Sequence, residues 1–303
     1  MMSSVIIENL SKSYGEVPAV DDISLSIDTG EIFGFIGPDG AGKTTLFRML
    51  TTLLIPDKGK ATVEGFDIVK EFKKIRSLVG YMPGRFSLYQ DLTVEENLHF
   101  FASVFGTTIQ ENYNLIKDIY VLLEPFRKRK AGKLSGGMKQ KLALCCALIH
   151  KPKILFLDEP TTGVDPVSRN EFWDMLGYLK KEGITIVVST PYMDEANKCD
   201  RIALMQRGKI LETNYLKNII ARYPVKLFAV KSDVMFILLK DLRDYKSASS
   251  VFSFGDSLHY SDTRTDVTKD DLLNYLISKE HKNILIEEIE PNIEDCFMDL
   301  MSK

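Results

Sequence analysis

The sequence has no apolar run long enough to cross a membrane. A spanning helix needs about 20 mainly apolar residues, and the longest candidate, Leu142 to Ile149, is far shorter. No secretory leader is recognisable at the start of the chain. We therefore expect a protein of the cytoplasm that reaches a membrane only through other chains.

A strong excess of charge is also missing. The chain carries 39 Lys and Arg against 42 Asp and Glu, a formal net charge of −3, which disfavours a dedicated nucleic-acid binder. Its four cysteines include the adjacent Cys145 and Cys146 and have no metal-ligand spacing, so reduced thiols are expected. A length of 303 residues, 45% of them hydrophobic and 27% charged, is typical of a soluble protein with two domains.

One glycine-rich stretch has the spacing G-x-x-x-x-G-K-[ST] of a phosphate-binding loop. It joins an expected buried strand, 31–36, to an expected helix, 44–50. Backbone N–H groups and the helix N-terminus would hold phosphates, with Lys43 on the outer ones and the Thr44 hydroxyl on Mg²⁺. A glycine-rich turn without a ligand is the alternative. The expected nucleotide-binding residues here are Gly37, Pro38, Asp39, Gly40, Ala41, Gly42, Lys43, Thr44 and Thr45.

Two carboxylates follow a short apolar strand, 154–157. At the carboxyl edge of a sheet, Asp158 would hold Mg²⁺ through water and Glu159 would act as the general base that orients the attacking water. Adjacent buried carboxylates are costly without a cation nearby, which disfavours a purely structural role. Further along, Asp165 and Pro166 are expected to cap and begin a helix.

A second helix N-terminus is offered by the run 134–140, Leu-Ser-Gly-Gly-Met-Lys-Gln, with Ser135 as the expected N-cap. If a helical segment separates it from Lys43, it would serve the phosphates of a neighbouring subunit. Before it, Thr93 is expected to open a helix with a capping box, and a further helix is expected over 110–123. The basic run 126–133 reads as a solvated connector or as a partner contact.

An aromatic residue, Tyr14, lies between two expected strands, 5–7 and 23–27. Its ring could stack on a purine with Val20 alongside, or it could be an ordinary surface or core residue.

Together, the segments 37–45, 134–140, 154–160 and 163–166 resemble the nucleotide-binding subunit of an ABC transporter, over about residues 3–222. The resemblance implies a P-loop ATPase α/β fold with a RecA-like core, an antiparallel β edge and a helical subdomain at about 84–150. It implies ATP and Mg²⁺ as cofactors, and a head-to-tail dimer. In that dimer Ser135, Gly136 and Gly137 complete the ATP site of the other subunit. By position, Tyr14 looks like the adenine-stacking aromatic, Asp158 the Walker B aspartate, Glu159 the catalytic glutamate and Asp165 the interface aspartate.

Three positions depart from that pattern. Asp39 replaces the usual asparagine, Gly84 the glutamine that contacts Mg²⁺ and water, and Pro191 the histidine that contacts the γ-phosphate. Gln90 lies too far along the chain to substitute, and no histidine occurs between His150 and His259. Proline offers neither a side-chain donor nor an N–H. Losing one such preorganised group typically lowers the rate on the order of a hundred- to a thousand-fold.

The interpretation is an ATP-binding subunit of a bacterial ABC exporter at the cytoplasmic face of the cell membrane, with an impaired site of its own. It would pair with a second, consensus subunit and with ABC-2-type permease subunits at about 86–97. The alternatives are a homodimeric ATPase with altered loops and an ATP-gated scaffold that does not hydrolyse. A soluble ABC protein acting on ribosomes or DNA is disfavoured. After 1–222, residues 223–303 are expected to form a β-α-β-β-α-β ferredoxin-like domain for dimer contact or regulation.

Overall fold

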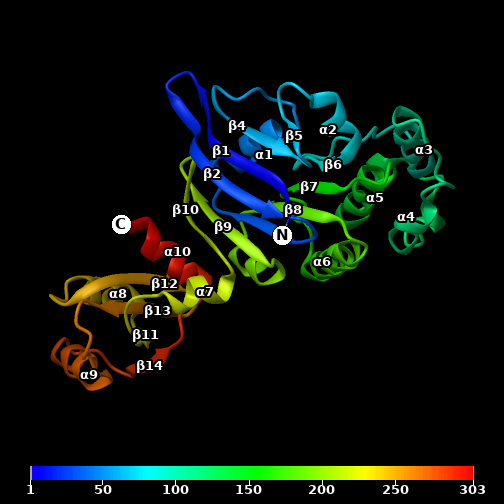
Figure 1. Ribbon diagram of the computed structural model, residues 1–303. Coiled ribbons are helices and arrows are strands. Elements are labelled where there is room, and N and C mark those ends of the chain that lie inside the picture. Colours follow the sequence, from blue (N-terminus) through cyan, green and yellow to red (C-terminus); the bar gives the residue numbers. More distant parts are fainter. Residues whose placement is uncertain (1, 303) are drawn as a thin grey trace. The chain divides into compact units, whose positions relative to one another are not determined.

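The computed structural model describes residues 2–302, which form two compact units divided between Tyr215 and Leu216 (Figure 1). The sequence had suggested a boundary after residue 222. The division lies earlier because helix α7 (Leu216–Ala221) packs against helix α10 (Ile293–Ser302) of the second unit.

The centre of the first unit is a six-stranded sheet in the order β10-β9-β3-β8-β7-β6. All neighbouring strands are parallel except the edge pair β9 and β10. The inner strands β3, β7 and β8 are buried along their whole length, and their side chains are largely apolar, as in sheets covered on both faces. The bounds of the six strands are β3 Ile32–Ile36, β6 Val79–Met82, β7 Ile154–Asp158, β8 Thr185–Thr190, β9 Arg201–Gln206 and β10 Lys209–Asn214. The carboxyl ends of β3, β7 and β8 therefore meet at one edge.

A second, antiparallel sheet has the order β2-β1-β4-β5. Its strands are β1 Ser3–Tyr14, β2 Val17–Asp28, β4 Lys58–Val63 and β5 Phe66–Asp67. A core cluster between this sheet and the first includes Phe33, Phe47 and Phe156, whose rings are fully buried. This is the antiparallel edge that the sequence predicted.

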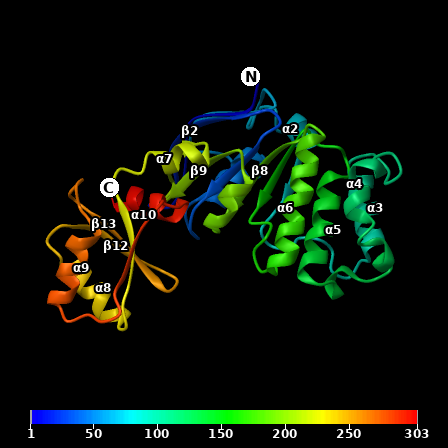
Figure 2. The same ribbon diagram turned by 90° about the horizontal axis from the view of Figure 1, so that it is seen from below.

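Helices α3 to α5 gather at one end of the first unit, and α6 lies beside α5 (Figures 1 and 2). The expected capping box at Thr93 and the expected N-caps Ser135 and Asp165 are confirmed. The helix expected over 110–123 is shorter and is followed by 3₁₀ turns. The helical bounds are α1 Lys43–Leu50, α2 Phe72–Leu78, α3 Val94–Val104, α4 Tyr113–Tyr120, η1 Glu124–Phe126, η2 Ala131–Lys133, α5 Gly136–Leu148, α6 Pro166–Lys181 and η3 Met193–Lys198.

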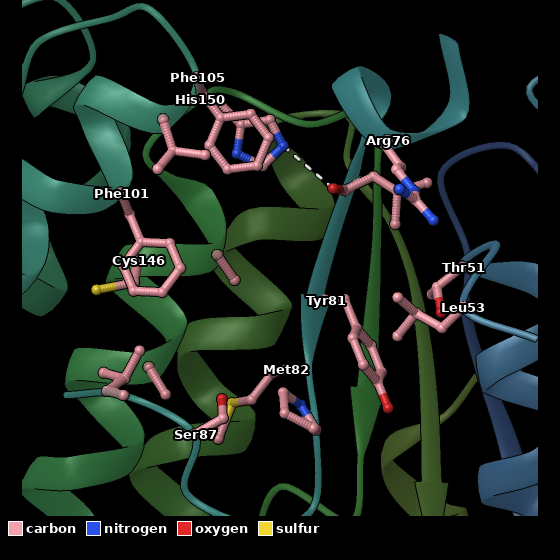
Figure 3. Close-up of a pocket in the computed structure, with 16 residues that line it drawn as sticks. Thr51, Leu53, Arg76, Tyr81, Met82, Ser87, Phe101, Phe105, Cys146 and His150 are labelled. Atoms are coloured by element: carbon pink, nitrogen blue, oxygen red, sulfur yellow. Dashed lines mark hydrogen bonds between the residues drawn. The ribbon is translucent and has the colours of Figure 1, made fainter. Parts of the chain in front are cut away.

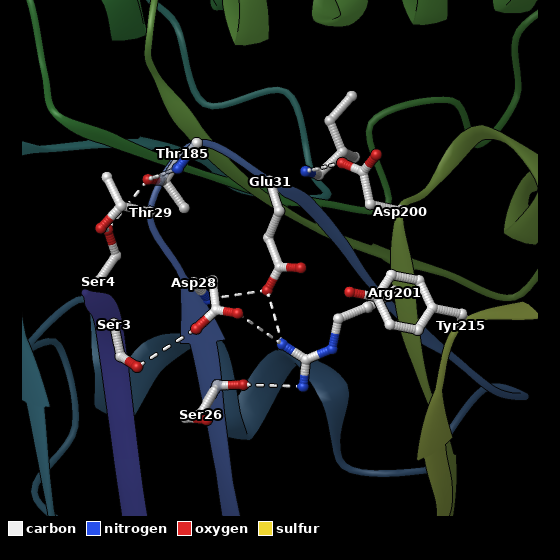
Figure 4. Close-up of polar contacts among 12 residues, drawn as sticks. Ser3, Ser4, Ser26, Asp28, Thr29, Glu31, Thr185, Asp200, Arg201 and Tyr215 are labelled. Carbon is white, nitrogen blue, oxygen red and sulfur yellow. Dashed lines mark hydrogen bonds and ion pairs between the residues drawn. The ribbon is translucent and has the colours of Figure 1, made fainter. Parts of the chain in front are cut away.

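An ion-pair network joins the two sheets at the amino end of β3 (Figure 4). Arg201 Nη1 lies 3.1 Å from Glu31 Oε1 and 3.6 Å from Asp28 Oδ2, and its guanidinium covers the Phe33 ring. Burial raises the pKa of Glu31, and the neighbouring Arg201 opposes this shift. The network lies at the opposite end of β3 from the phosphate loop.

The second unit has a four-stranded antiparallel sheet in the order β12-β13-β11-β14. Numbered along the chain this is the order 2-3-1-4, that of a ferredoxin-like fold, as the sequence predicted.

Among residues 2–302, no helix is both long and apolar enough to span a membrane. The bounds of these elements of the second unit are β11 Leu227–Lys231, α8 Met235–Arg243, β12 Ala248–Phe254, β13 Ser257–Asp262, α9 Lys269–Ser278 and β14 Leu285–Ile289.

Candidate nucleotide-binding site

The phosphate loop connects the end of β3 to the start of α1, where the sequence predicted it. Gly40 and Gly42 have φ values of 78° and 104°, which only glycine adopts without strain. A Cβ atom at Gly37 would lie 2.0 Å from the Met205 carbonyl oxygen. The backbone of the loop therefore requires these glycines.

The Lys43 side chain is 3% exposed and folds back over its own loop. Its Nζ donates to the carbonyl oxygens of Gly37 at 2.7 Å and Pro38 at 3.0 Å, and lies 3.3 Å from Glu159 Oε1. The ammonium group thus occupies the concave side of the loop, where phosphates are expected.

Oxygen atoms suited to a divalent cation converge beside the loop. The Thr44 hydroxyl donates to Asp158 Oδ1 at 3.1 Å, and the Ser189 hydroxyl donates to the same oxygen at 2.6 Å. Mg²⁺ prefers one or two carboxylates together with substrate phosphates. No group of three His, Cys, Asp or Glu residues in the described part of the chain could hold a metal. A hydroxyl beside a single buried carboxylate therefore fits Mg²⁺ that arrives with a nucleotide. Burial, with Asp158 nearby, raises the pKa of Tyr81 to about 12.

Glu159 has an unusual backbone. Its φ is 50°, in the left-handed region that costs a non-glycine residue about 1 kcal/mol or more. Its N–H donates to the backbone oxygen and to the hydroxyl of Ser189, both at 3.0 Å. These contacts fix Glu159 at the end of β7, with its carboxylate toward Lys43.

Two of the three departures from the family pattern, Gly84 and Pro191, lie near Asp158, Glu159 and the phosphate loop. Gly84 is adjacent to Asp158 and Glu159: a Cβ there would lie 3.0 Å from the Asp158 carbonyl oxygen. Pro191 follows Thr190, whose carbonyl oxygen accepts from the Gly37 N–H at 3.2 Å. Gln90 is held elsewhere, because its carbonyl oxygen accepts from the Gly132 N–H at 2.9 Å. Neither Gly84 nor Pro191 brings a polar side chain to the site.

The start of α5 is open to solvent. Ser135 and Gly136 are exposed, and the Ser135 hydroxyl accepts from the Met138 N–H at 3.3 Å. Gly136 and Glu159 line one pocket, but of the described phosphate-loop residues none lines it. Asp165 caps α6, and the hydrogen bond from Ser168 lowers the pKa of Asp165.

Tyr14 and Val20 do not form a pair at the surface. Tyr14 is 49% exposed at the end of β1, so its ring is available for stacking. Val20 is fully buried in the core between the two sheets. Sheet packing therefore covers the Val20 side chain, and its contact with a base stays a prediction.

The basic run 126–133 contacts α3 through its backbone. The N–H groups of Val94 and Glu95 donate to the carbonyl oxygens of Arg129 and Arg127, both at 3.1 Å. Its charged side chains are largely exposed. This agrees with the solvated connector, one of the two interpretations of this run. The other, a contact with a partner, stays a prediction.

Sequence reasoning missed two features. The first is the end of β8, where Ser189 bonds Asp158 and Glu159, and Thr190 bonds the phosphate loop at Gly37. The sequence of this strand contains no motif that predicts these contacts. An apolar groove of about 410 Å³ lies between α3, α5 and β6. In Figure 3 the stacked rings of Phe105 and His150 lie at one end of the groove, and Tyr81 and Leu53 lie across from Phe101 and Cys146.

Comparisons with known proteins agree with this site. A family model described as "ABC transporter" matches residues 20–162. The chain is 41% identical over 289 residues to the "Probable multidrug ABC transporter ATP-binding protein YbhF" of Escherichia coli (strain K12). That match covers 94% of this chain but 49% of the relative, so the chain spans about half of its length.

Three further matches cover more of the matched proteins. Identity is 32% over 308 residues to the "Linearmycin resistance ATP-binding protein LnrL" of Bacillus subtilis (strain 168), covering 98% of this chain and 97% of that protein. A solved "Structure of ATP binding subunit of ABC transporter" matches with a TM-score of 0.67 at 26% identity, covering 73% of this chain and 93% of that one. A second structure, titled "Dimeric structure of a post-hydrolysis state of the ATP-binding cassette MJ0796 bound to ADP and Pi", has a TM-score of 0.63 at 27% identity, covering 70% and 98%.

Proposed function

Because this chain belongs to the ABC transporter family of ATP-binding proteins, we propose that it is the ATP-binding subunit of a bacterial exporter. It couples ATP binding and hydrolysis to movement of separate membrane subunits. The observation that carries this proposal is the convergence of Lys43, Asp158 and Glu159 at one edge of the sheet. The names of its relatives, which include multidrug and linearmycin proteins, support export without identifying what this chain's partners transport.

The residues present fit ATP with Mg²⁺. The phosphate loop N–H groups and Lys43 hold the phosphates, Thr44 and Asp158 hold the cation, and Tyr14 stacks on the adenine. When bound, Mg²⁺ neutralises charge that develops on the phosphates. Glu159 accepts a proton from the attacking water as the water oxygen bonds to the γ-phosphorus. The bond to the β-γ bridging oxygen breaks, giving ADP and phosphate.

The chain's own site is slow, because Gly84 and Pro191 provide no donor to the γ-phosphate or the water. Glu159 remains in place. The exposed start of α5, with Ser135, Gly136 and Gly137, completes the ATP site of a second subunit whose own residues follow the consensus. An asymmetric heterodimer with a fast and a slow site follows. The alternatives are a homodimer that hydrolyses with altered loops, and a scaffold whose ATP binding only assists dimer closure.

The membrane partner is an ABC-2-type permease, and it docks on the apolar groove. An amphipathic helix fits such a groove through its apolar face. Phe101, Val104 and Ala143 offer that face a contact surface, while Arg76 and His150 lie among the lining residues as polar contacts. The chain thereby sits at the cytoplasmic face of the cell membrane as a peripheral subunit. Nucleic acid is not among its partners.

ATP turnover by the purified chain tests this function, measured beside Glu159→Gln with nucleotide binding in parallel. Binding with turnover no higher than that of the variant supports the slow-site heterodimer. Brisk turnover that Glu159→Gln abolishes supports the homodimeric enzyme instead. A chain that binds no ATP contradicts the proposal altogether.

A further inference from the structure

One buried carboxylate, that of Glu195, joins two loops of the ATP site to α6. Glu195 is 3% exposed. Its Oε1 accepts from the Thr161 hydroxyl at 2.7 Å and from Arg169 Nε and Nη2 at 3.2 and 3.0 Å. Hydrogen bonds between ionised groups in a buried place are strong, and the charge is costly to leave unpaired. These three residues therefore hold a single arrangement, defined here as the Glu195 clamp.

The first loop bound by the clamp is the one that begins at Glu159. Thr161 lies two residues after Glu159 and is 1% exposed. The same loop ends at Asp165, whose carbonyl oxygen accepts from the Arg169 N–H at 2.9 Å in the first turn of α6. The expected general base and the expected interface aspartate therefore flank the clamp on one segment.

The second loop is the one that contains Pro191. Arg169 stacks over the Tyr192 ring at 4.2 Å and pairs with Asp194 at 3.4 Å as well as with Glu195. The Thr190 hydroxyl accepts from the Tyr192 N–H at 3.1 Å. The polar groups of this loop thus bind each other and α6.

The phosphate loop contacts both loops at their starts. The Gly37 N–H donates to the Thr190 carbonyl oxygen at the end of β8, and Lys43 Nζ lies 3.3 Å from Glu159 Oε1. A phosphate that takes Lys43 away from Glu159 changes the first loop directly. Since Pro191 has no donor, the second loop can follow only through its attachments.

We propose that Glu195 is a positioning residue of the ATP site. Its clamp makes the loops 159–165 and 190–195 move as one body with the start of α6, so that nucleotide binding at the phosphate loop reaches Asp165. The inference rests on the proposed function. It adds a residue that contacts neither nucleotide nor metal.

The chain contains a single tryptophan, Trp173, which lies on α6. Its fluorescence can be used to detect a change at the Glu195 clamp. Trp173 and Glu195 line the same pocket, of about 100 Å³. Within residues 2–302, Trp173 Nε1 and Glu195 Oε2 are both buried without a hydrogen-bond partner. The tryptophan fluorescence of the chain therefore has one source, and Trp173 adjoins the clamp.

The test compares Glu195→Gln with Glu31→Gln, using ATP and Mg²⁺ as the probe. Glu31 is a matched control because it is a buried carboxylate that pairs with an arginine at 3.1 Å, at the opposite end of β3. We expect Glu195→Gln to keep its ATP affinity within about threefold and to lose the ATP-induced change in Trp173 emission. Any turnover that the wild-type chain shows above Glu159→Gln should fall by about tenfold, with little change in KM. Glu31→Gln keeps all three.

If Glu195→Gln does not fold, Thr161→Val replaces it in the same comparison with Glu31→Gln. This substitution removes the hydroxyl that donates to Glu195 Oε1 and keeps the shape of the side chain. The proposal is overturned if Glu195→Gln retains the emission change, or if Glu31→Gln loses it equally. It is also overturned if the wild-type chain binds ATP with no emission change. A wild-type chain that does not bind ATP contradicts the proposed function instead, so the two failures are distinguishable.

Discussion

Lys43 and Glu159 form an ion pair, with 3.3 Å between Nζ and Oε1, across the space where phosphates are expected. The lysine that should bind phosphate and the carboxylate that should accept a proton therefore contact each other. ATP must compete for Lys43, and in doing so it releases Glu159. Occupation of the phosphate loop and readiness of the general base are coupled through this pair.

Glu159→Gln should therefore bind ATP more tightly than the wild-type chain. Removing the charge frees Lys43 and reduces repulsion of the γ-phosphate. Because the Glu159 side chain is 23% exposed, solvent partly screens the pair, and we expect an affinity gain of roughly two- to fivefold. A fluorescent ATP analogue measures this directly. Glu171→Gln, which breaks the surface pair with Lys141, is the matched control and should leave affinity unchanged. Equal or weaker binding by Glu159→Gln would show that the pair does not compete with ATP.

The phosphate loop and the helix caps were predictable because their signals are local. The glycines, Lys43 and the capping residues Thr93, Ser135 and Asp165 lie within a few residues of the backbone groups that they bind or shape. The order of strands in the second unit followed from the alternation of strand and helix patterns. Each of these depends on short-range chemistry that a sequence shows directly.

The Glu195 clamp and the burial of Val20 were not predictable in this way. Thr161 and Glu195 are 34 positions apart and meet only because β7 and β8 are neighbours in the sheet. The sequence predicts Val20 beside Tyr14 at the surface, but packing of the two sheets buries it. Strands β9 and β10 and helices α2, α7 and α10 were likewise missed. Tertiary packing decides these features, and no local pattern encodes it.

Pro191→His should raise turnover at this chain's own site. The substitution returns a side-chain donor beside Thr190 and the phosphate loop, so we expect a gain of about tenfold or more in kcat. Steady-state phosphate release measures it, with Pro191→Ala as the control that restores an N–H but no side-chain donor. No gain over Pro191→Ala would mean that Gly84 alone limits the site.

Adding a side chain at Gly84 should destabilise the fold. A Cβ there meets the Asp158 carbonyl oxygen at 3.0 Å, so Gly84→Ala is expected to cost about 1 kcal/mol or more. Gly177→Ala, on α6 with nothing within 4 Å of the added atom, should instead stabilise by about 0.5–1 kcal/mol. Urea unfolding of both variants measures whether the free energy of unfolding falls for Gly84→Ala and rises for Gly177→Ala. A stable Gly84→Ala would indicate that the loop has room for a glutamine.

Stability should fall as the pH drops below the ordinary histidine pKa of 6.5, because of His150. Burial lowers the pKa of His150, whose ring stacks on Phe105 at 3.8 Å and whose Nε2 bonds the Val79 carbonyl oxygen. The unfolded chain therefore binds a proton at a pH where the folded chain does not. The stabilisation is complete above pH 6.5 and is lost as the pH falls toward the lowered folded pKa. His150→Gln should flatten this slope in urea unfolding, while His99→Gln, at an exposed position, should not.

A charge placed in the apolar groove should separate the chain from the membrane. Val104 is 60% exposed and lines the groove, whereas Val121 is 49% exposed and does not line it. Val104→Glu would put a carboxylate against the apolar face of the docking helix, and burying an unpaired charge is strongly unfavourable. We expect Val104→Glu to leave ATP binding intact and to move the chain from the membrane fraction of its native cells to the soluble fraction. Val121→Glu should stay with the membranes. If Val104→Glu remains membrane-bound as firmly as Val121→Glu, the permease does not dock on this groove.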